Sequence, residues 1–228
     1  EAKSLQTTMP KLAAGFALEG DVHAARQQWP QAERAYRDAL KVEPASDALA
    51  IKLHTTLNRA GKAAEAEAMA KKWLAEHPKD AGFRIYLAER ALADKNLRSA
   101  VTHYQAVVAL QPDNVVALNN LAWSAGQLGD PKAIGYAERA VRLAPDNAAA
   151  LDTLGNLLVS KGDTIKGLEY LTKAAELAPK RHDIRLNYAK ALAKAGRSDD
   201  ARKELVALQA VADEFPGKSE IPALLKGL

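Results

Sequence analysis

Prolines recur at a nearly constant interval along this chain. They stand at Pro10, Pro44, Pro78, Pro112, Pro145 and Pro179, with spacings of 34, 34, 34, 33 and 34 residues. A fixed period of this length is typical of proteins built from stacked repeats, each repeat being one supersecondary unit. The spacing predicts six units, at residues 13–46, 47–80, 81–114, 115–147, 148–181 and 182–215.

Each unit has the pattern of two helices joined by a tight turn. In the fifth unit, residues 148–161 carry leucines on one helical stripe, and Gly162 can adopt the left-handed conformation that ends a helix. Residues 165–177 carry a second stripe, and Pro179 prevents that helix from continuing. A small residue recurs where the two helices would cross, at Ala32, Ala66, Ala100, Ala133, Gly167 and Ala201. One such pair cannot bury its own apolar stripe, so neighbouring pairs must stack.

Composition supports an all-helical fold. Among 228 residues there are 48 Ala and 30 Leu, whereas aromatic residues make up 5%. Alanine favours helices, and the scarce aromatic and β-branched residues are those that sheets require. No cysteine is present, which excludes disulfides, thiolate metal sites and a cysteine nucleophile. No apolar run approaches the length of about 20 residues that a membrane span needs.

The two ends depart from the repeat. Residues 1–12 read as a partial repeat or lead-in, and because the sequence starts at Glu1 rather than Met, we expect a processed or truncated piece. The first unit has Gln27 where most units have glycine, and the sixth lacks its proline. We expect residues 216–228 to form a cap in which Ser219–Leu228 is a short helix that covers the last unit with its apolar side chains, Ile221, Leu224, Leu225 and Leu228.

The repeat resembles the tetratricopeptide repeat family. The matching features are the leucine and small-residue pair in the first helix, the glycine turn, the small residue at the helix crossing and the closing proline. The resemblance implies an all-α fold, a right-handed α-solenoid of about six helix pairs with a C-terminal capping helix. It also implies that the first helix of each pair lines a concave groove in which a partner binds.

Residue patterns give no support for catalysis. The chain has no GxGxxG, GxSxG or HExxH motif and no phosphate-binding glycine loop. Its five histidines are spread over five units without the spacing of metal ligands, and His54 reads as a packed helix residue. We therefore predict a protein that is not an enzyme and that needs no cofactor and no metal.

The predicted groove has two different halves. Its first half is expected to be a mostly apolar strip, formed by Ala14, Ala17, Leu18, Ile51, Lys52, Ile85, Tyr86 and Glu89. Its second half is polar and supplies the candidate binding residues, Asn119, Asn120, Trp123, Gln127, Asp152, Thr153, Asn156, Asn187, Lys190 and Lys194.

Within that second half, Asn120, Thr153 and Asn187 occupy equivalent places in successive units. Amide side chains both donate and accept hydrogen bonds, so such a polar ladder could hold the backbone of an extended segment. Trp123 could serve as an aromatic anchor beside it. The alternative is that the asparagines bond between neighbouring helices and that Trp123 is packed.

Charge concentrates near the C-terminal end. The whole chain has a net charge of +4, and residues 180–204 contain eight Lys or Arg against four Asp or Glu. This excess predicts an anionic partner, which could be an acidic protein segment, a carboxyl terminus or an acidic polysaccharide. Nucleic acid is disfavoured, because the basic residues are few and no aromatic residues are interleaved with them.

Three stretches in the last three units are similar to the C-terminal repeats of bacterial tetratricopeptide lipoproteins from exopolysaccharide and PEP-CTERM protein-sorting systems. They are residues 117–123, 150–155 and 191–197. The resemblance implies a periplasmic scaffold tethered to a membrane by a lipid, with a cytoplasmic protein as the alternative. The leading hypothesis is a non-catalytic adaptor that binds an extended segment. Its rivals are a regulatory repeat domain of a larger enzyme and a direct binder of anionic polysaccharide.

Overall fold

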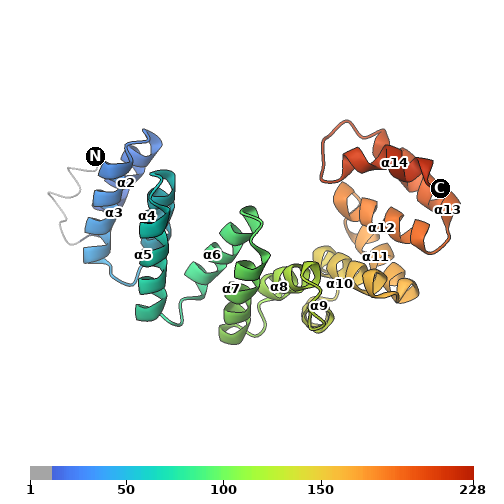
Figure 1. Ribbon diagram of the computed structural model, residues 1–228, viewed down its shortest axis with the longest axis horizontal. Coiled ribbons are helices and arrows are strands. Elements are labelled where there is room, and N and C mark those ends of the chain that lie inside the picture. Colours follow the sequence, from blue (N-terminus) through green and yellow to red (C-terminus); the bar gives the residue numbers. More distant parts are fainter. Residues whose placement is uncertain (1–11) are drawn as a thin grey trace. The chain divides into compact units, whose positions relative to one another are not determined.

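The computed structural model describes residues 12–228, and these residues form helices joined by short turns, with no strand among them (Figure 1). The chain divides into two compact units, one ending at Leu87 and one running from Ala88 to Leu228. The helices of the first unit are α2 (Ala13–Ala25), α3 (Trp29–Val42), α4 (Asp47–Arg59) and α5 (Ala63–Glu76). The division falls within α6 (Ala81–Ala93).

The second unit continues with seven further repeat helices and the two short helical segments that follow them. These are α7 (Leu97–Leu110), α8 (Val115–Gln127), α9 (Ala133–Leu143), α10 (Ala148–Lys161), α11 (Thr164–Leu177), α12 (His182–Lys194), α13 (Ser198–Gln209), the 3₁₀ turn η1 (Lys218–Glu220) and α14 (Ile221–Lys226). The predicted all-helical fold of repeated pairs with a C-terminal helix is confirmed. None of the helices formed by residues 12–228 is long and apolar enough to cross a membrane.

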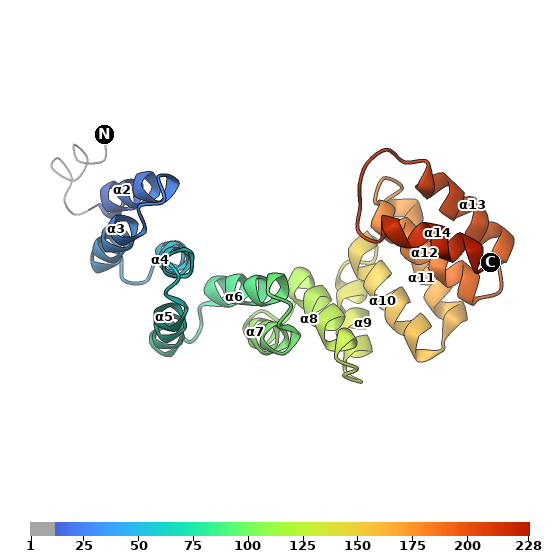
Figure 2. The ribbon, with the colours of Figure 1, turned by 45° about the horizontal axis from the view of Figure 1, so that its top comes forward.

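Within each unit, consecutive helices contact each other, and neighbouring helix pairs stack. In the second unit, α8 packs on α9, α10 on α11, and α12 on α13. The first helices of successive pairs also touch, because α10 contacts both α8 and α12, as Figure 2 shows. We call the exposed side shared by α8, α10 and α12 the A-helix surface.

In the turn inside each helix pair, one residue has a left-handed backbone conformation. Gly61, Gly129, Gly162 and Gly196 all have positive φ, between 72° and 98°. Glycine pays no steric penalty in this region. In the first and third repeats, where glycine is absent, Gln27 and Lys95 take the same conformation with φ of 57°. The left-handed turn is therefore imposed by the packing of the pair even where the sequence does not favour it.

Small residues let the paired helices approach closely, as the sequence predicts. The crossing alanines of the first, third and sixth repeats are fully buried. In the fifth repeat, glycine stands on both helices at the point where they cross. A Cβ added to Gly155 would lie only 2.8 Å from the carbonyl oxygen of Gly167. A side chain there would force the helices apart.

Asparagines begin two of the helices that carry the A-helix surface. The side chain of Asn114 accepts a hydrogen bond from the Ala117 amide at 2.9 Å, and Asn147 accepts one from Ala150 at 3.1 Å. These are N-caps, which satisfy amides that have no partner inside the helix.

The C-terminal segment covers the last pair. Ile221 is fully buried beside Leu186, Leu205 and Leu208, and Leu224, Leu225 and Leu228 pack against the same cluster. The capping contact predicted for Ser219–Leu228 is therefore present. The lead-in predicted for residues 1–12 lies, except for its last residue, outside the described residues, and the repeat boundaries stay a prediction.

Candidate functional site

A cluster around Asp152 is the main polar feature of the A-helix surface. The amide nitrogen of Asn187, on α12, donates to both carboxylate oxygens of Asp152, on α10, at 3.0 and 3.1 Å. Asn156, one helical turn along α10, donates to Oδ1 of Asp152 at 3.1 Å and to its backbone carbonyl at 2.9 Å. Three predicted site residues are thus brought together, and they connect two neighbouring repeats.

Burial shifts the protonation of this carboxyl group. Partial burial penalises the charged form and raises the pKa of Asp152 from 3.8 to about 6, although the hydrogen bonds from Asn187 and Asn156 act in the opposite direction. The nearby charge of Asp183 adds to the rise, and Arg181 opposes it. At neutral pH the group carries a negative charge, and because the carboxylate is partly buried, this charge lowers the stability of the fold.

Trp123 lies on α8 with 45% of its surface exposed. Packing therefore leaves a large part of its indole ring accessible to a ligand. Trp73 of the first unit shows the contrast, since it is 6% exposed and donates its indole N–H to Asp80 at 2.7 Å. Gln127, at the end of α8, is also exposed.

The predicted polar ladder is not available as a whole. Thr153 is only 6% exposed, so it cannot contact a bound segment. The amide nitrogen of Asn120 donates to the hydroxyl of Tyr104, on α7, at 3.0 Å. Asn119 is half-buried, and its side-chain oxygen is buried without a hydrogen-bond partner among the described residues. Two members of the ladder therefore serve helix packing, which is the alternative that the sequence left open.

Lys190 and Lys194, two of the predicted binding residues, are both engaged. Lys190 binds the carboxylate of Glu220, in the C-terminal segment, at 2.6 Å. Lys194 donates to the carbonyl oxygen of Val159, on α10, at 2.6 Å. Sequence reasoning missed Glu220 and Tyr104 as partners, because each comes from a helix or turn other than that of the residue it binds.

Most of the remaining basic stretch at residues 180–204 is paired in the same way. Arg181 binds Asp183 at 2.5 Å, Arg185 binds Glu204 at 2.7 Å and Arg197 binds Asp200 at 2.6 Å. Those three carboxylates are among the four acidic residues already counted in the stretch, and only Glu220, the partner of Lys190, lies outside it, so an excess of positive charge remains at this end. The acidic partner therefore stays a prediction.

The polar members of the strip expected in the first unit have partners within the fold. Lys52 binds Asp21 at 2.6 Å, and the hydroxyl of Tyr36 donates to the same carboxylate at 2.7 Å. The hydroxyl of Tyr86 lies 2.8 Å from Nδ1 of the buried His54. Polar side chains of α2, α3, α4 and α6 thus bond with one another on this side of the unit. The apolar character of the rest of the strip stays a prediction.

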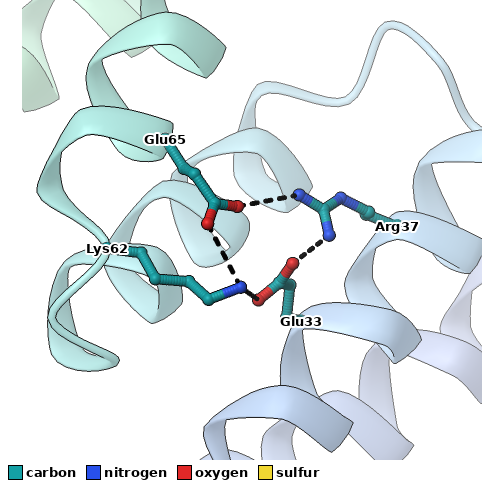
Figure 3. Close-up of polar contacts among 4 residues, drawn as sticks. All are labelled: Glu33, Arg37, Lys62 and Glu65. Carbon is teal, nitrogen blue, oxygen red and sulfur yellow. Dashed lines mark hydrogen bonds and ion pairs between the residues drawn. The ribbon is translucent and has the colours of Figure 1, made fainter.

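A second charged cluster in the first unit joins α3 to α5 (Figure 3). The nearly buried Glu33 binds Arg37 on its own helix and Lys62, at the start of α5, at 3.1 Å. Glu65 completes the ring by pairing with Lys62 at 3.4 Å and with Arg37 at 3.9 Å. Two acidic and two basic groups balance here, so the cluster holds two helices together and leaves no net charge for a ligand.

Models of known protein families match most of this chain. Tetratricopeptide repeat models match residues 18–81, 55–115 and 85–148, and a second tetratricopeptide repeat model matches residues 158–216. This chain belongs to the tetratricopeptide repeat family. Tetratricopeptide repeats bind peptide or protein partners, and the family consists in general of non-catalytic scaffolds.

Solved structures show the same tetratricopeptide fold. A tetratricopeptide repeat protein from Parabacteroides merdae has a TM-score of 0.71 at 16% identity over 94% of this chain and 88% of its own. The pilF protein of Pseudomonas aeruginosa has a TM-score of 0.68 at 18% identity, covering 95% and 97%. YrrB, described as having an unusual peptide-binding site, has a TM-score of 0.63 at 18% identity, covering 85% and 98%. No curated protein sequence matches at a significant level.

Proposed function

We propose that this tetratricopeptide chain is a non-catalytic scaffold that holds an extended segment of a partner protein on the A-helix surface of α8, α10 and α12. The observation that carries the proposal is the exposure of Trp123, 45%, on a helix that contacts the one bearing Asp152 and Asn156. A large aromatic side chain left open beside oriented polar groups is the usual composition of a binding hot spot.

The scale of the surface suits a short segment. Three helices packed about 9 Å apart span roughly 20–30 Å, which about eight extended residues cover. Trp123 can supply apolar contact area, while Asn156 and Asn187 fix the position of the Asp152 carboxylate. The description of the similar structure YrrB as a protein with a peptide-binding site supports the same class of ligand.

A selection experiment tests this function. A displayed library of random peptides of about eight residues is selected against the full chain, and the affinity of the selected peptides is measured by fluorescence anisotropy. Trp123→Ala should weaken their binding about tenfold or more, because it removes the aromatic anchor. Ile165→Ala is the matched control, since Ile165 is 77% exposed but lies on α11, outside the A-helix surface.

Two results would contradict the proposal. One is a library that yields no binder. The other is a set of binders whose affinity is the same for Trp123→Ala as for the control. In either case the exposed indole would have no role in holding a segment.

The cellular setting is a separate proposal that rests on sequence resemblance. Residues 117–123, 150–155 and 191–197 support a scaffold in a bacterial exopolysaccharide or PEP-CTERM sorting system, lipid-tethered in the periplasm, against a cytoplasmic location. Fractionation of cells that produce the full-length protein distinguishes the two, because a tethered protein sediments with membranes. The genomic neighbours of the full-length gene also decide whether the repeats regulate a larger enzyme.

Direct recognition of an acidic segment or an anionic polysaccharide is the rival reading of the basic end. Its support is the charge excess of residues 180–204. The double variant Lys190→Glu/Lys194→Glu tests it, because binding of polyglutamate or alginate through this end should be abolished when both charges are reversed. Unchanged binding would exclude these lysines as the contact.

A further inference from the structure

Asp152 is charged, unlike the residues at the equivalent position of the other repeats. The equivalent places in the other five repeats hold only uncharged residues, Ala17, Ile51, Ile85, Asn119 and Leu186. The fold therefore does not need a carboxylate at this point of the first helix. Because the other five repeats have uncharged residues at this position, the reason for the charge at Asp152 must lie in the surroundings of this residue.

Those surroundings hold the carboxylate in place but do not neutralise it. Asn156 and Asn187 donate hydrogen bonds to it, and both are uncharged. Among residues 12–228, no Lys, Arg or His forms an ion pair with Asp152. Arg181, the cation whose charge it senses, is bonded to Asp183.

The helices next to this carboxylate carry few charged groups. None of the residues of α8, Val115–Gln127, is charged. On α10 the other charged residue is Lys161, nine positions further along the helix. On α12, Lys190 is paired with Glu220, Lys194 donates to the carbonyl oxygen of Val159, and Asp183 and Arg185 are paired with Arg181 and Glu204. Toward α8, then, the surface offers a negative group and an exposed indole ring with no competing charge.

Holding a charged carboxylate in this half-buried place lowers stability, since burial disfavours the ionised form. Uncharged residues at the equivalent positions show that the cost is avoidable. Costs of this kind concentrate at binding and active sites, where the group serves a ligand.

We propose that Asp152 is the receptor for a basic side chain, Lys or Arg, of the extended segment bound on the A-helix surface. Asn156 and Asn187 fix the carboxylate oxygens, and Trp123, one helical turn beyond the Asn119 position on α8, provides an aromatic face near the incoming cation. This inference rests on the proposed function and assigns its partner a basic character, where the sequence predicted an acidic one.

The test uses the full chain and three capped synthetic peptides of equal length, with alternating Lys-Ala, Gln-Ala or Glu-Ala sequences. Affinities are measured by anisotropy at low ionic strength and neutral pH. We expect the Lys-Ala peptide to bind most tightly. The net charge of the chain is +4, so non-specific attraction would favour the Glu-Ala peptide and cannot produce this order.

Asp152→Asn is the decisive variant, because it removes the charge while keeping the size of the side chain and an oxygen that accepts from both asparagines. It should weaken binding of the Lys-Ala peptide about tenfold, the value of one charge-assisted hydrogen bond, and leave the Gln-Ala peptide unchanged. Glu169→Gln is the control, since it removes the same charge from an exposed site on α11.

The two proposals fail differently. If Trp123→Ala weakens library peptides but Lys-Ala peptides bind Asp152→Asn as tightly as the wild type, the basic partner is excluded and the scaffold function stands. An equal loss in Asp152→Asn and Glu169→Gln would also exclude it, because the effect would then come from net charge. If no peptide binds and Trp123→Ala changes nothing, the scaffold function itself is overturned.

Discussion

At the scale of single residues, the binding surface depends on one carboxyl group and on the amides that orient it. Asp152 accepts from Asn156 and Asn187, and its pKa is raised to about 6 by partial burial. Neither Asn120 nor Thr153 contributes in the predicted way, because one donates to Tyr104 and the other is buried. Equivalent repeat positions thus carry different roles once their partners are known.

This pKa shift predicts how stability depends on pH. The folded state binds the Asp152 proton more tightly than the unfolded state, so the group contributes its full stability below pH 3.8 and loses it as the pH rises toward about 6. Asp152→Asn avoids this loss. The substitution changes the free energy of unfolding at each pH. We expect this change to be more favourable at pH 7 than at pH 4 by roughly 1–2 kcal/mol.

Urea unfolding monitored by circular dichroism at both pH values measures the difference. Glu169→Gln is again the control, because Glu169 is exposed on α11. An effect of Asp152→Asn that is the same at both pH values, or less favourable at pH 7 than at pH 4, would show that the charge of Asp152 does not destabilise the fold.

At the scale of helices and turns, the recurring features are the left-handed turn, the small residues at the crossing and the final helix. Gln27 and Lys95 adopt positive φ where other repeats have glycine, so the packing of the pair determines the turn. Helix α14 covers Leu186, Leu205 and Leu208 of the last pair. An array of repeats needs such a cover, because its last apolar face has no following repeat.

Removing Ser219–Leu228 should therefore destabilise the protein. The deletion exposes the leucines under α14 and removes Ile221, so we expect a loss of about 2–4 kcal/mol in the free energy of unfolding, measured by urea denaturation. Glu220→Gln keeps the apolar cover but breaks the ion pair with Lys190, and should cost less than about 1 kcal/mol. Equal losses in the two variants would assign the stabilisation to charge instead of apolar contact.

At the scale of the whole molecule, the chain separates into a unit that ends at Leu87 and a unit that runs from Ala88 to Leu228. Every candidate binding residue lies in the second unit. In a repeat protein each pair contacts its neighbours, so stability accumulates locally and parts of the array can fold without the rest.

A fragment of residues 81–228, which starts with an intact α6, should fold and bind alone. We expect a helical circular dichroism spectrum, cooperative melting and an affinity for the Lys-Ala peptide within about twofold of the full chain, because no residue of the site is removed. Phe83 loses its contact with Trp73 in this fragment, which lowers its stability but not its affinity. A folded fragment that does not bind would place part of the site in residues 1–80.

The sequence by itself determined the helix pairs, their turns and closing prolines, and the small residues at their crossings. These features repeat every 34 residues or nearly so, because they depend on backbone conformation and on burial at fixed helical positions. Only the tertiary structure decided which polar groups remain available. Asp152 and Asn187 are 35 residues apart, and Lys190 and Glu220 are 30. A hydrogen bond depends on side-chain positions to within a few tenths of an ångström, and the packing of neighbouring helices sets those positions.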